Sequence, residues 1–142
     1  MFLGTYTPKL DAKGRFFLPA KFRPELSEGL VITRGQDRSL AVYPMDTFTE
    51  ITRQVMTAPA TVRQVRDYQR MLAASASDEI PDKQGRIMIP AALRSYAGLT
   101  DEIVVIGAID RVEIWDPQTW EEYSSSQEEI FSDLNEELFT AK

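Results

Sequence analysis

The sequence predicts a mainly β protein with short helices (α+β), in which two tandem repeats fold together as one small β-barrel with pseudo-two-fold symmetry. Two observations favour this fold. Residues 11–23 recur without a gap as residues 82–94, which marks an internal repeat. Each repeat, at about 45 residues, is too short to bury a core of its own, so the two are expected to share one.

The two copies align over most of their length. DAKGRFFLPAKFR (11–23) and DKQGRIMIPAALR (82–94) share Asp, Gly, Arg, Pro, Ala and Arg in register, 71 residues apart. Two later segments match at a spacing of 72 residues: VITRG (31–35) with IVVIG (103–107), and LAVYPMDTF (40–48) with VEIWDPQTW (112–120). A chance likeness between two hairpins does not explain so many shared positions.

Each copy is expected to contain the same elements in the same order. In the Asp-x-x-Gly turn, Asp caps the turn with its side chain and Gly supplies a positive φ. The proline after the next strand suits the first position of a short helix, and a later glycine suits its end. Closely spaced β-prone runs then predict a hairpin. The expected elements, first copy before second, are strands at 2–6 and 77–80, strands at 15–18 and 86–89, helices from Pro19 and Pro90 to Gly29 and Gly98, and hairpins of 31–34 with 40–43 and of 103–106 with 112–115.

Helical sequence lies between the copies and after the second. Apolar residues keep helical spacing on both sides of Pro59, which predicts two helices in the connector. Asp116 and Pro117 suit the N-cap and first turn of a last helix, which the serines at 124–126 weaken. The expected organisation is one domain, 1–142, made of repeat 1 (5–47), a helical connector (48–75), repeat 2 (76–119) and an acidic C-terminal helix or tail (120–142).

Composition and charge bound the function. The chain has no cysteine and no histidine, which removes thiolate chemistry, the usual general base and the commonest metal ligand. The N-terminus lacks a signal peptide and the longest apolar run, Ile103–Ile109, is too short to span a bilayer, so a cytoplasmic protein without membrane contact is expected. The net charge of −6 hides an asymmetry, because residues 1–44 carry +3 and residues 81–142 carry −8.

The paired D-x-x-G-R…[LI]-P-A-x-[FL]-R segments, each followed by a strand with an aromatic end and by a helix, closely resemble the MraZ family. That family belongs to the SpoVT-AbrB group of swapped-hairpin DNA-binding proteins, and the resemblance covers nearly the whole chain. It implies a bacterial, nucleoid-associated transcriptional regulator of the cell-division and cell-wall gene cluster, including its own promoter. It also implies a ring-like homo-oligomer that binds short direct repeats of double-stranded DNA.

The family's D-x-x-x-R signature falls on Asp11 with Arg15 and on Asp82 with Arg86, and the resemblance implies that these arginines meet DNA. A guanidinium that follows a turn glycine can project into solvent and span O6 and N7 of guanine, the commonest specific contact in the major groove. Nearby lysines suit phosphates, which fix position without specifying sequence. The candidate DNA-binding residues are Arg15, Arg86, Lys9, Lys13 and Lys83, and the residues expected to structure the loops are Asp11, Gly14, Asp82 and Gly85.

The second copy departs from the first at the basic positions. Lys9, Lys13 and Lys21 of the first copy correspond to Ile80, Gln84 and Ala92 of the second, and only Lys83 is gained. The second copy is therefore expected to contribute less to DNA binding. Pro24, opposite Ser95, is also expected to shorten or kink the helix of the first copy.

Plainer interpretations exist for each of these residues. The D-x-x-G-R segment alone also fits a well-formed turn with a surface arginine. Residues on the short helices fit a solvated face or a subunit contact at least as well as DNA contact, and the large aromatic residues fit the core better than base stacking. The acidic tail fits a solvated face, or a contact with a subunit or partner. These residues are Lys21, Arg23 and Arg94 on the helices, and Tyr43, Phe48, Trp115 and Trp120 among the aromatics.

Two other classes of function were compared with DNA binding. An antitoxin-like or oligomeric protein-interaction module would use the same fold without specific DNA contact. A Mg²⁺-dependent nuclease or phosphoryl-transfer enzyme would need a compact set of carboxylates at regular spacing, which the sequence lacks. We therefore expect no enzymatic activity, no metal or other cofactor and no small-molecule substrate.

Overall fold

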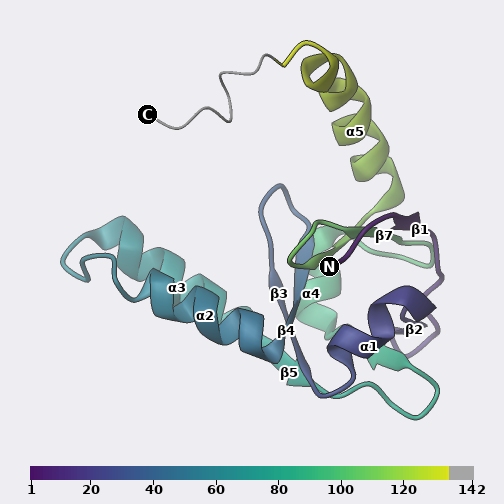
Figure 1. Ribbon diagram of the computed structural model, residues 1–142, viewed down its shortest axis with the longest axis horizontal. Coiled ribbons are helices and arrows are strands. Elements are labelled where there is room, and N and C mark those ends of the chain that lie inside the picture. Colours follow the sequence, from purple (N-terminus) through teal and green to yellow (C-terminus); the bar gives the residue numbers. More distant parts are fainter. Residues whose placement is uncertain (135–142) are drawn as a thin grey trace.

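The computed structural model describes residues 1–134 and shows a sheet with short helices at its edge and longer helices leading away from it (Figure 1). The strands are β1 (Thr5–Tyr6), β2 (Arg15–Phe17), β3 (Leu30–Arg34), β4 (Leu40–Pro44), β5 (Ser77–Glu79), β6 (Arg86–Met88), β7 (Val104–Gly107) and β8 (Val112–Trp115). The helices are η1 (Ala20–Phe22), α1 (Arg23–Leu26), α2 (Met45–Val55), α3 (Arg63–Ser75), α4 (Ala91–Ala97) and α5 (Pro117–Ser132).

The strands of the two copies are interleaved in one antiparallel sheet. Its order is β1-β7-β8-β4-β3-β5. At one edge β1 of the first copy pairs with the β7–β8 hairpin of the second copy, and at the other edge β5 of the second copy pairs with the β3–β4 hairpin of the first. Strands β2 and β6 pair with each other as a separate two-stranded ribbon. This exchange confirms that the two repeats fold together as a mainly β unit with short helices.

A single large apolar cluster joins the sheet to the ribbon. Both ribbon strands alternate, with Phe16 and Ile87 buried and their neighbours facing outward, because successive side chains of a strand point to opposite faces. Phe16 pairs directly with Ile87 across the ribbon. The buried cluster consists of Phe2, Phe16, Leu18, Phe22, Leu26, Leu30, Ile32, Leu40, Val42, Ile87, Ile89, Leu93, Ala97, Ile103, Val105, Val112 and Ile114.

The short helix differs between the copies, as Pro24 predicts. In the first copy it is split into η1 and α1, whereas α4 of the second copy is continuous and ends at Gly98 with φ +65°. Two expectations were wrong in detail. Pro19 and Pro90 are N-caps with extended ψ, one position before the first helical residue, and α1 ends at Leu26, before Gly29. Pro24 shortens the helix because its ring removes an N–H and limits its backbone conformation.

The longer helices confirm the connector and the final helix. Helices α2 and α3 lie on either side of Pro59, and the Asp116 carboxylate accepts a hydrogen bond from the Thr119 amide at 3.0 Å to cap α5. Helix α5 continues through the serines at 124–126. None of the three helices has a buried residue. Among residues 1–134, no helix combines the length and the apolar character that a membrane span requires.

Candidate nucleic-acid interface

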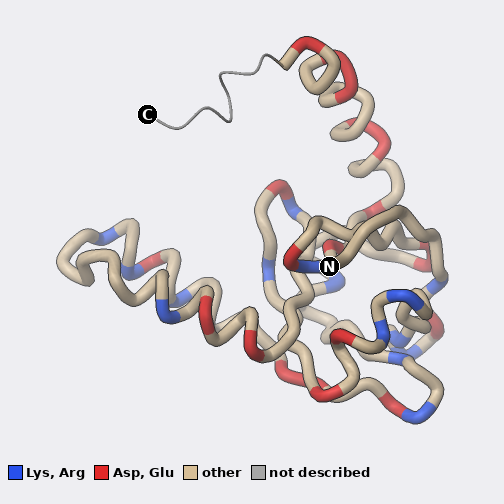
Figure 2. Tube along the Cα trace, viewed as in Figure 1, with Lys and Arg blue, Asp and Glu red and all other residues tan. Residues whose placement is uncertain are grey.

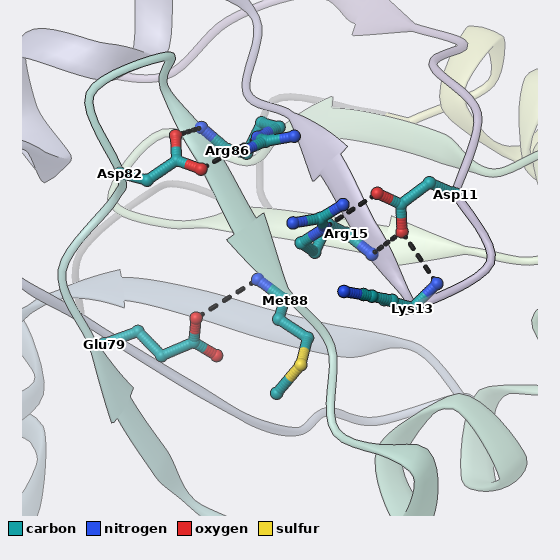
Figure 3. A network of polar contacts seen from close by, with 7 residues as sticks. All are labelled: Asp11, Lys13, Arg15, Glu79, Asp82, Arg86 and Met88. Carbon is teal, nitrogen blue, oxygen red and sulfur yellow. Dashed lines mark hydrogen bonds and ion pairs between the residues drawn. The ribbon is translucent and has the colours of Figure 1, made fainter.

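The outward face of the β2–β6 ribbon presents both signature arginines (Figure 3). Arg15 pairs with Met88, and Arg86 pairs with Phe17. The two arginines are thus diagonal neighbours on one face, at a typical spacing of roughly 7–8 Å. Phe17 and Met88, also on this face, are about half exposed. Pairing of the ribbon therefore brings together two loops that are 71 residues apart in the chain.

Loop 1 (residues 11–15) is organised by one carboxylate. One oxygen of Asp11 accepts hydrogen bonds from the backbone amides of Lys13 and Arg15, both at 2.9 Å. The other oxygen accepts from Nε of Arg15 at 2.7 Å. Gly14 adopts φ +80°, a conformation that favours glycine. Asp11 therefore fixes both the turn and the direction of the arginine side chain.

Loop 2 (residues 82–86) repeats this geometry. Asp82 accepts from the backbone amides of Gln84 and Arg86, both at 2.9 Å, and from Nε of Arg86 at 2.8 Å. Gly85 adopts φ +79°. Corresponding distances in the two loops agree within 0.1 Å. The side chain of the middle residue, Lys13 or Gln84, takes no part, which explains how it could diverge.

The same hydrogen bonds lower the pKa of both aspartates. For Asp11 the backbone amide of Arg15 is the largest cause. Desolvation opposes it, and the Arg15 side chain and the Lys13 amide lower the pKa further. The Arg86 amide lowers the pKa of Asp82 in the same way. Each carboxylate is therefore ionised at neutral pH and offsets part of the charge of its arginine.

The arginines are more restrained than the sequence predicts. Only 34% of the Arg15 side chain and 25% of the Arg86 side chain are exposed, because each lies along its aspartate. Arg86 also lies over the Phe17 ring, with Cζ 5.8 Å from the ring centre. The carboxylate contacts involve Nε, so the terminal Nη groups have no hydrogen-bond partner within residues 1–134. Each arginine thus has a fixed direction and two Nη groups left to donate to a ligand.

Each loop is braced by the other copy. Leu18 donates its amide to the Gly85 carbonyl at 2.9 Å, and Ile89 donates to the Gly14 carbonyl at 2.8 Å. A Cβ on Gly14 would overlap the guanidinium of Arg94, and a Cβ on Gly85 would lie 2.6 Å from Nε of Arg23. The glycines therefore provide room for an arginine as well as a positive φ.

Sequence reasoning missed this role of Arg23 and Arg94, which it placed on a solvated face or at a subunit contact. Arg23 donates from Nε to the carbonyl of Leu18 at 2.9 Å. Leu18 lies between β2, which follows loop 1, and the helix η1. The available signal was the recurrence of this arginine in register at the end of both motifs. Its packing partner could not be identified, because it lies in the other copy.

The three candidate lysines lie in different surroundings. Lys13 and Lys83 are exposed within loops 1 and 2. The backbone of Lys9 instead pairs with that of Glu102 in an isolated β-bridge, and Lys9 lines a surface depression together with Asp101, Glu102 and Asp116. This acidic setting makes Lys9 less suited to a phosphate than the two loop lysines.

Glu79 makes the second copy's side of the ribbon different. Its Oε1 accepts a hydrogen bond from the Met88 amide at 3.1 Å, whereas Pro8 occupies the aligned position of the first copy (Figure 3). Burial raises the pKa of Glu79, and its Oε2 is buried without a hydrogen-bond partner among the described residues. Within residues 1–134, no three acidic side chains lie close enough together to hold a metal ion.

The chain is similar to a known family and to curated relatives over its full length. The family described as "MraZ protein, putative antitoxin-like" matches residues 1–71 and again residues 72–142. A protein of Cutibacterium acnes named Transcriptional regulator MraZ is 68% identical over 139 residues, which is 98% of each chain. Proteins with the same name from Thermobifida fusca and Frankia alni are 57% and 59% identical over 97% of this chain and 96% of their own length. The chain therefore belongs to the MraZ family.

Proposed function

We propose that this protein is a sequence-specific DNA-binding transcriptional regulator and that Arg15 and Arg86 contact base edges. The observation that supports this most directly is the pair of matching loops on one exposed ribbon face, each with an arginine held by an aspartate. If the loops served only as structural turns, neither copy would need an arginine whose guanidinium is held in place while its Nη groups stay free to donate. The name of the relatives, Transcriptional regulator MraZ, agrees with this function.

A two-stranded ribbon is narrow enough to enter the major groove of DNA. The free Nη donors of each arginine can span O6 and N7 of a guanine, which contributes about 1–3 kcal/mol of discrimination. Because Asp11 and Asp82 already fix the guanidinium groups, less side-chain entropy is lost on binding. Lys13 and Lys83, one in each loop, are placed to contact phosphates and set the position of the ribbon.

Binding by one chain is expected to be weak at physiological salt. Roughly four phosphate contacts give a slope of log K against log salt near −3.6, so a rise from about 50 to 200 mM salt costs on the order of a hundredfold. Several chains joined in a ring-like homo-oligomer can regain about 10²–10⁴ in affinity through avidity. The proposed target is a set of short direct repeats in the promoter of its own gene cluster for cell division and cell-wall synthesis.

The test is fluorescence anisotropy with the DNA upstream of the protein's own gene, with random DNA of equal length as competitor. Tight binding to the upstream DNA alone is expected. A half-turn insertion of roughly five base pairs between two repeats should then collapse the affinity, and a full-turn insertion should restore part of it, because adjacent subunits must meet the same face of the helix. Equal binding to both DNAs would refute specific recognition, and insensitivity to the half turn would refute cooperation between subunits.

A second candidate is an antitoxin-like protein-interaction module in the cytoplasm that makes no specific DNA contact. The observation that favours it is the absence of buried residues in α2, α3 and α5, which leaves apolar side chains of these helices exposed. We prefer DNA binding because a partner for these helices does not account for the matched loops on the ribbon. We propose no catalytic role, cofactor, small-molecule substrate or membrane contact for either candidate.

A further inference from the structure

Two arginines at the β3–β4 turn pack against one tyrosine. Cζ of Arg34 lies 5.1 Å and Cζ of Arg38 lies 5.0 Å from the centre of the Tyr96 ring. The Tyr96 hydroxyl donates to the Gly35 carbonyl at 2.7 Å and so fixes the ring. These contacts gather two positive charges at one edge of α4. We call Arg34, Arg38 and Tyr96 the arginine cluster.

The arginine cluster lacks a counter-charge. Neither arginine forms an ion pair within residues 1–134, and Nε of Arg34 is buried without a hydrogen-bond partner. The turn is also strained at Arg38, which adopts φ +61°, a conformation that glycine, asparagine and aspartate tolerate much better than arginine. Strain of this kind persists where the position serves a contact. Both features indicate a contact at this site, and the uncompensated positive charge indicates that the contact is with an acidic group.

The corresponding turn of the second copy gives the contrast. Its arginine, Arg111, pairs with Asp110 at 3.1 Å and with Glu113 at 2.9 Å. These ion pairs neutralise the second turn from within the copy. In the first turn, Asp37 forms no ion pair with either Arg34 or Arg38, so their charge is available to another molecule.

An apolar groove adjoins the arginine cluster. A cavity of about 360 Å³ is lined by Arg34, Met71 and Leu93 among others, and Tyr68 and Leu72 line the next one along. Met71 and Tyr68 are 51% and 47% exposed, which is high for large apolar side chains. The surface therefore combines positive charge with an uncovered apolar strip.

Helix α5 carries the complementary set of groups. Its first turns are anchored, because Trp120 and Tyr123 stack on Trp115 with ring centres 5.2 and 5.0 Å away. Beyond this anchor the helix leads away from the sheet (Figure 1), and it contains acidic but no basic residues (Figure 2). Its distal half and the residues just after it hold exposed apolar and acidic side chains together: Glu128, Glu129, Ile130, Phe131, Asp133 and Leu134.

We propose that the distal half of α5 from one copy docks into the groove beside the arginine cluster of a second copy. This inference rests on the homo-oligomer of the proposed function and identifies the contact between its subunits. Complementary charge identifies the occupant, since the helix is acidic and the cluster is basic. Its own copy is not the acceptor, because the aromatic anchor directs α5 away from the sheet. The contact joins two different surfaces, so repetition closes a ring or extends a filament.

The apolar side chains of the contact supply most of its affinity. Exposed ion pairs contribute little on their own, whereas burial of Ile130 and Phe131 against Met71 removes apolar surface from water. The charges set the orientation and exclude other partners. Reversal of charge on one surface places like charges opposite each other and should break the contact, whereas a matching reversal on the other surface should restore it.

The experiment is sedimentation velocity of the full chain without DNA, so failure of DNA binding leaves the result unaffected. Two variants are made, Arg34→Glu with Arg38→Glu, and Glu128→Arg with Glu129→Arg. Each alone should sediment as a single chain of 16.1 kDa, and an equimolar mixture should recover the parent's oligomer, because every contact is then between opposite charges. Arg53→Glu, at an exposed site on α2, is the matched control and should keep the parent's mass.

Circular dichroism establishes that each variant is folded, and Arg38→Glu alone provides a milder change at an exposed position. The proposal is overturned if the parent is a single chain, if either folded double variant keeps the parent's mass, or if the mixture stays dissociated. Recovery in the mixture supports it even where one variant is less stable, since a folding defect would not be repaired by the other chain.

Discussion

Loops 1 and 2 have the same internal geometry and different neighbours. Their carboxylate contacts agree within 0.1 Å, yet Lys13 of loop 1 is replaced by Gln84 in loop 2. The two loops share the aspartate that holds the arginine in place, and they differ at the position of Lys13, whose charge would attract a phosphate. The proposed base contact and the proposed phosphate contact are thus assigned to different residues of each loop.

The strands beyond the loops differ as well. The Met88 amide donates a hydrogen bond to Glu79, a carboxylate that the first copy lacks. Phe17 of the first copy instead supports the guanidinium of Arg86. Each loop keeps one lysine, so the carboxyl group beside the second copy's strand is the feature that predicts that the first copy dominates DNA binding.

The largest expected effect comes from removal of one guanidinium. Arg15→Ala should reduce operator affinity to that for random DNA, because a loss of about 1–3 kcal/mol at each subunit is multiplied in an oligomer. Arg86→Ala should weaken binding less, by roughly tenfold, since the Glu79 carboxyl group lies beside its strand. Fluorescence anisotropy against operator and random DNA measures both. Arg53→Ala, exposed on α2, is the control, and parental binding by both loop variants would exclude the loops from the interface.

The second prediction concerns the space that Gly14 leaves for Arg94. Gly14→Ala should lower the free energy of unfolding by about 1–2 kcal/mol, the usual cost of this φ for an L-residue, with a small further loss because the guanidinium at the end of the flexible Arg94 side chain must move. Gly98→Ala is the matched control, with φ +65° and nothing within 4 Å of the added Cβ. Urea denaturation compares the two. Equal losses would show that the overlap costs nothing, and Gly14→Ala combined with Arg94→Ala should recover the difference.

The third prediction sharpens the comparison of the loops by making loop 2 more like loop 1. Gln84→Lys should raise DNA affinity a few-fold at low salt and make the slope of log K against log salt more negative by about 0.9, as one further phosphate contact requires. A salt series of binding isotherms measures the slope. Gln64→Lys, exposed on α3, adds the same charge elsewhere and should leave the slope nearly unchanged. An equal change in both variants would assign the effect to net charge.

The smallest effect is expected on acidification. The pKa of Asp11 and of Asp82 is lower in the folded chain than the ordinary 3.8, so their contribution to stability is present above that pH and is lost as the pH falls through the folded value. The Nε–H signals of Arg15 and Arg86 should therefore stay constant from neutral pH to about pH 4 and change below it. NMR titration measures them. Asp11→Asn should leave the Arg86 signal unaffected, and a change already near pH 6 would contradict the assignment.

Much of the fold could be predicted because the repeat marks equivalent positions. The hairpins, the helices on either side of Pro59, the cap at Asp116 and the effect of Pro24 all follow from local spacing and from glycine or proline, whose backbone preferences are strong. Helix ends were predicted less well. The N-cap position of Pro19 and Pro90 depends on one residue of backbone geometry, which composition does not specify.

The sequence by itself determined the duplicated motif, the basic and acidic halves, the order of elements and the residues that build loops 1 and 2. These depend on short-range preferences and on charge, which a linear chain displays. Only the tertiary structure decided which groups meet across the chain: Gly14 with Arg94, Gly85 with Arg23, and two arginines with Tyr96. Such pairs depend on the exchange of strands between the copies, and sequence spacing does not specify contacts between side chains that only the folded chain brings together.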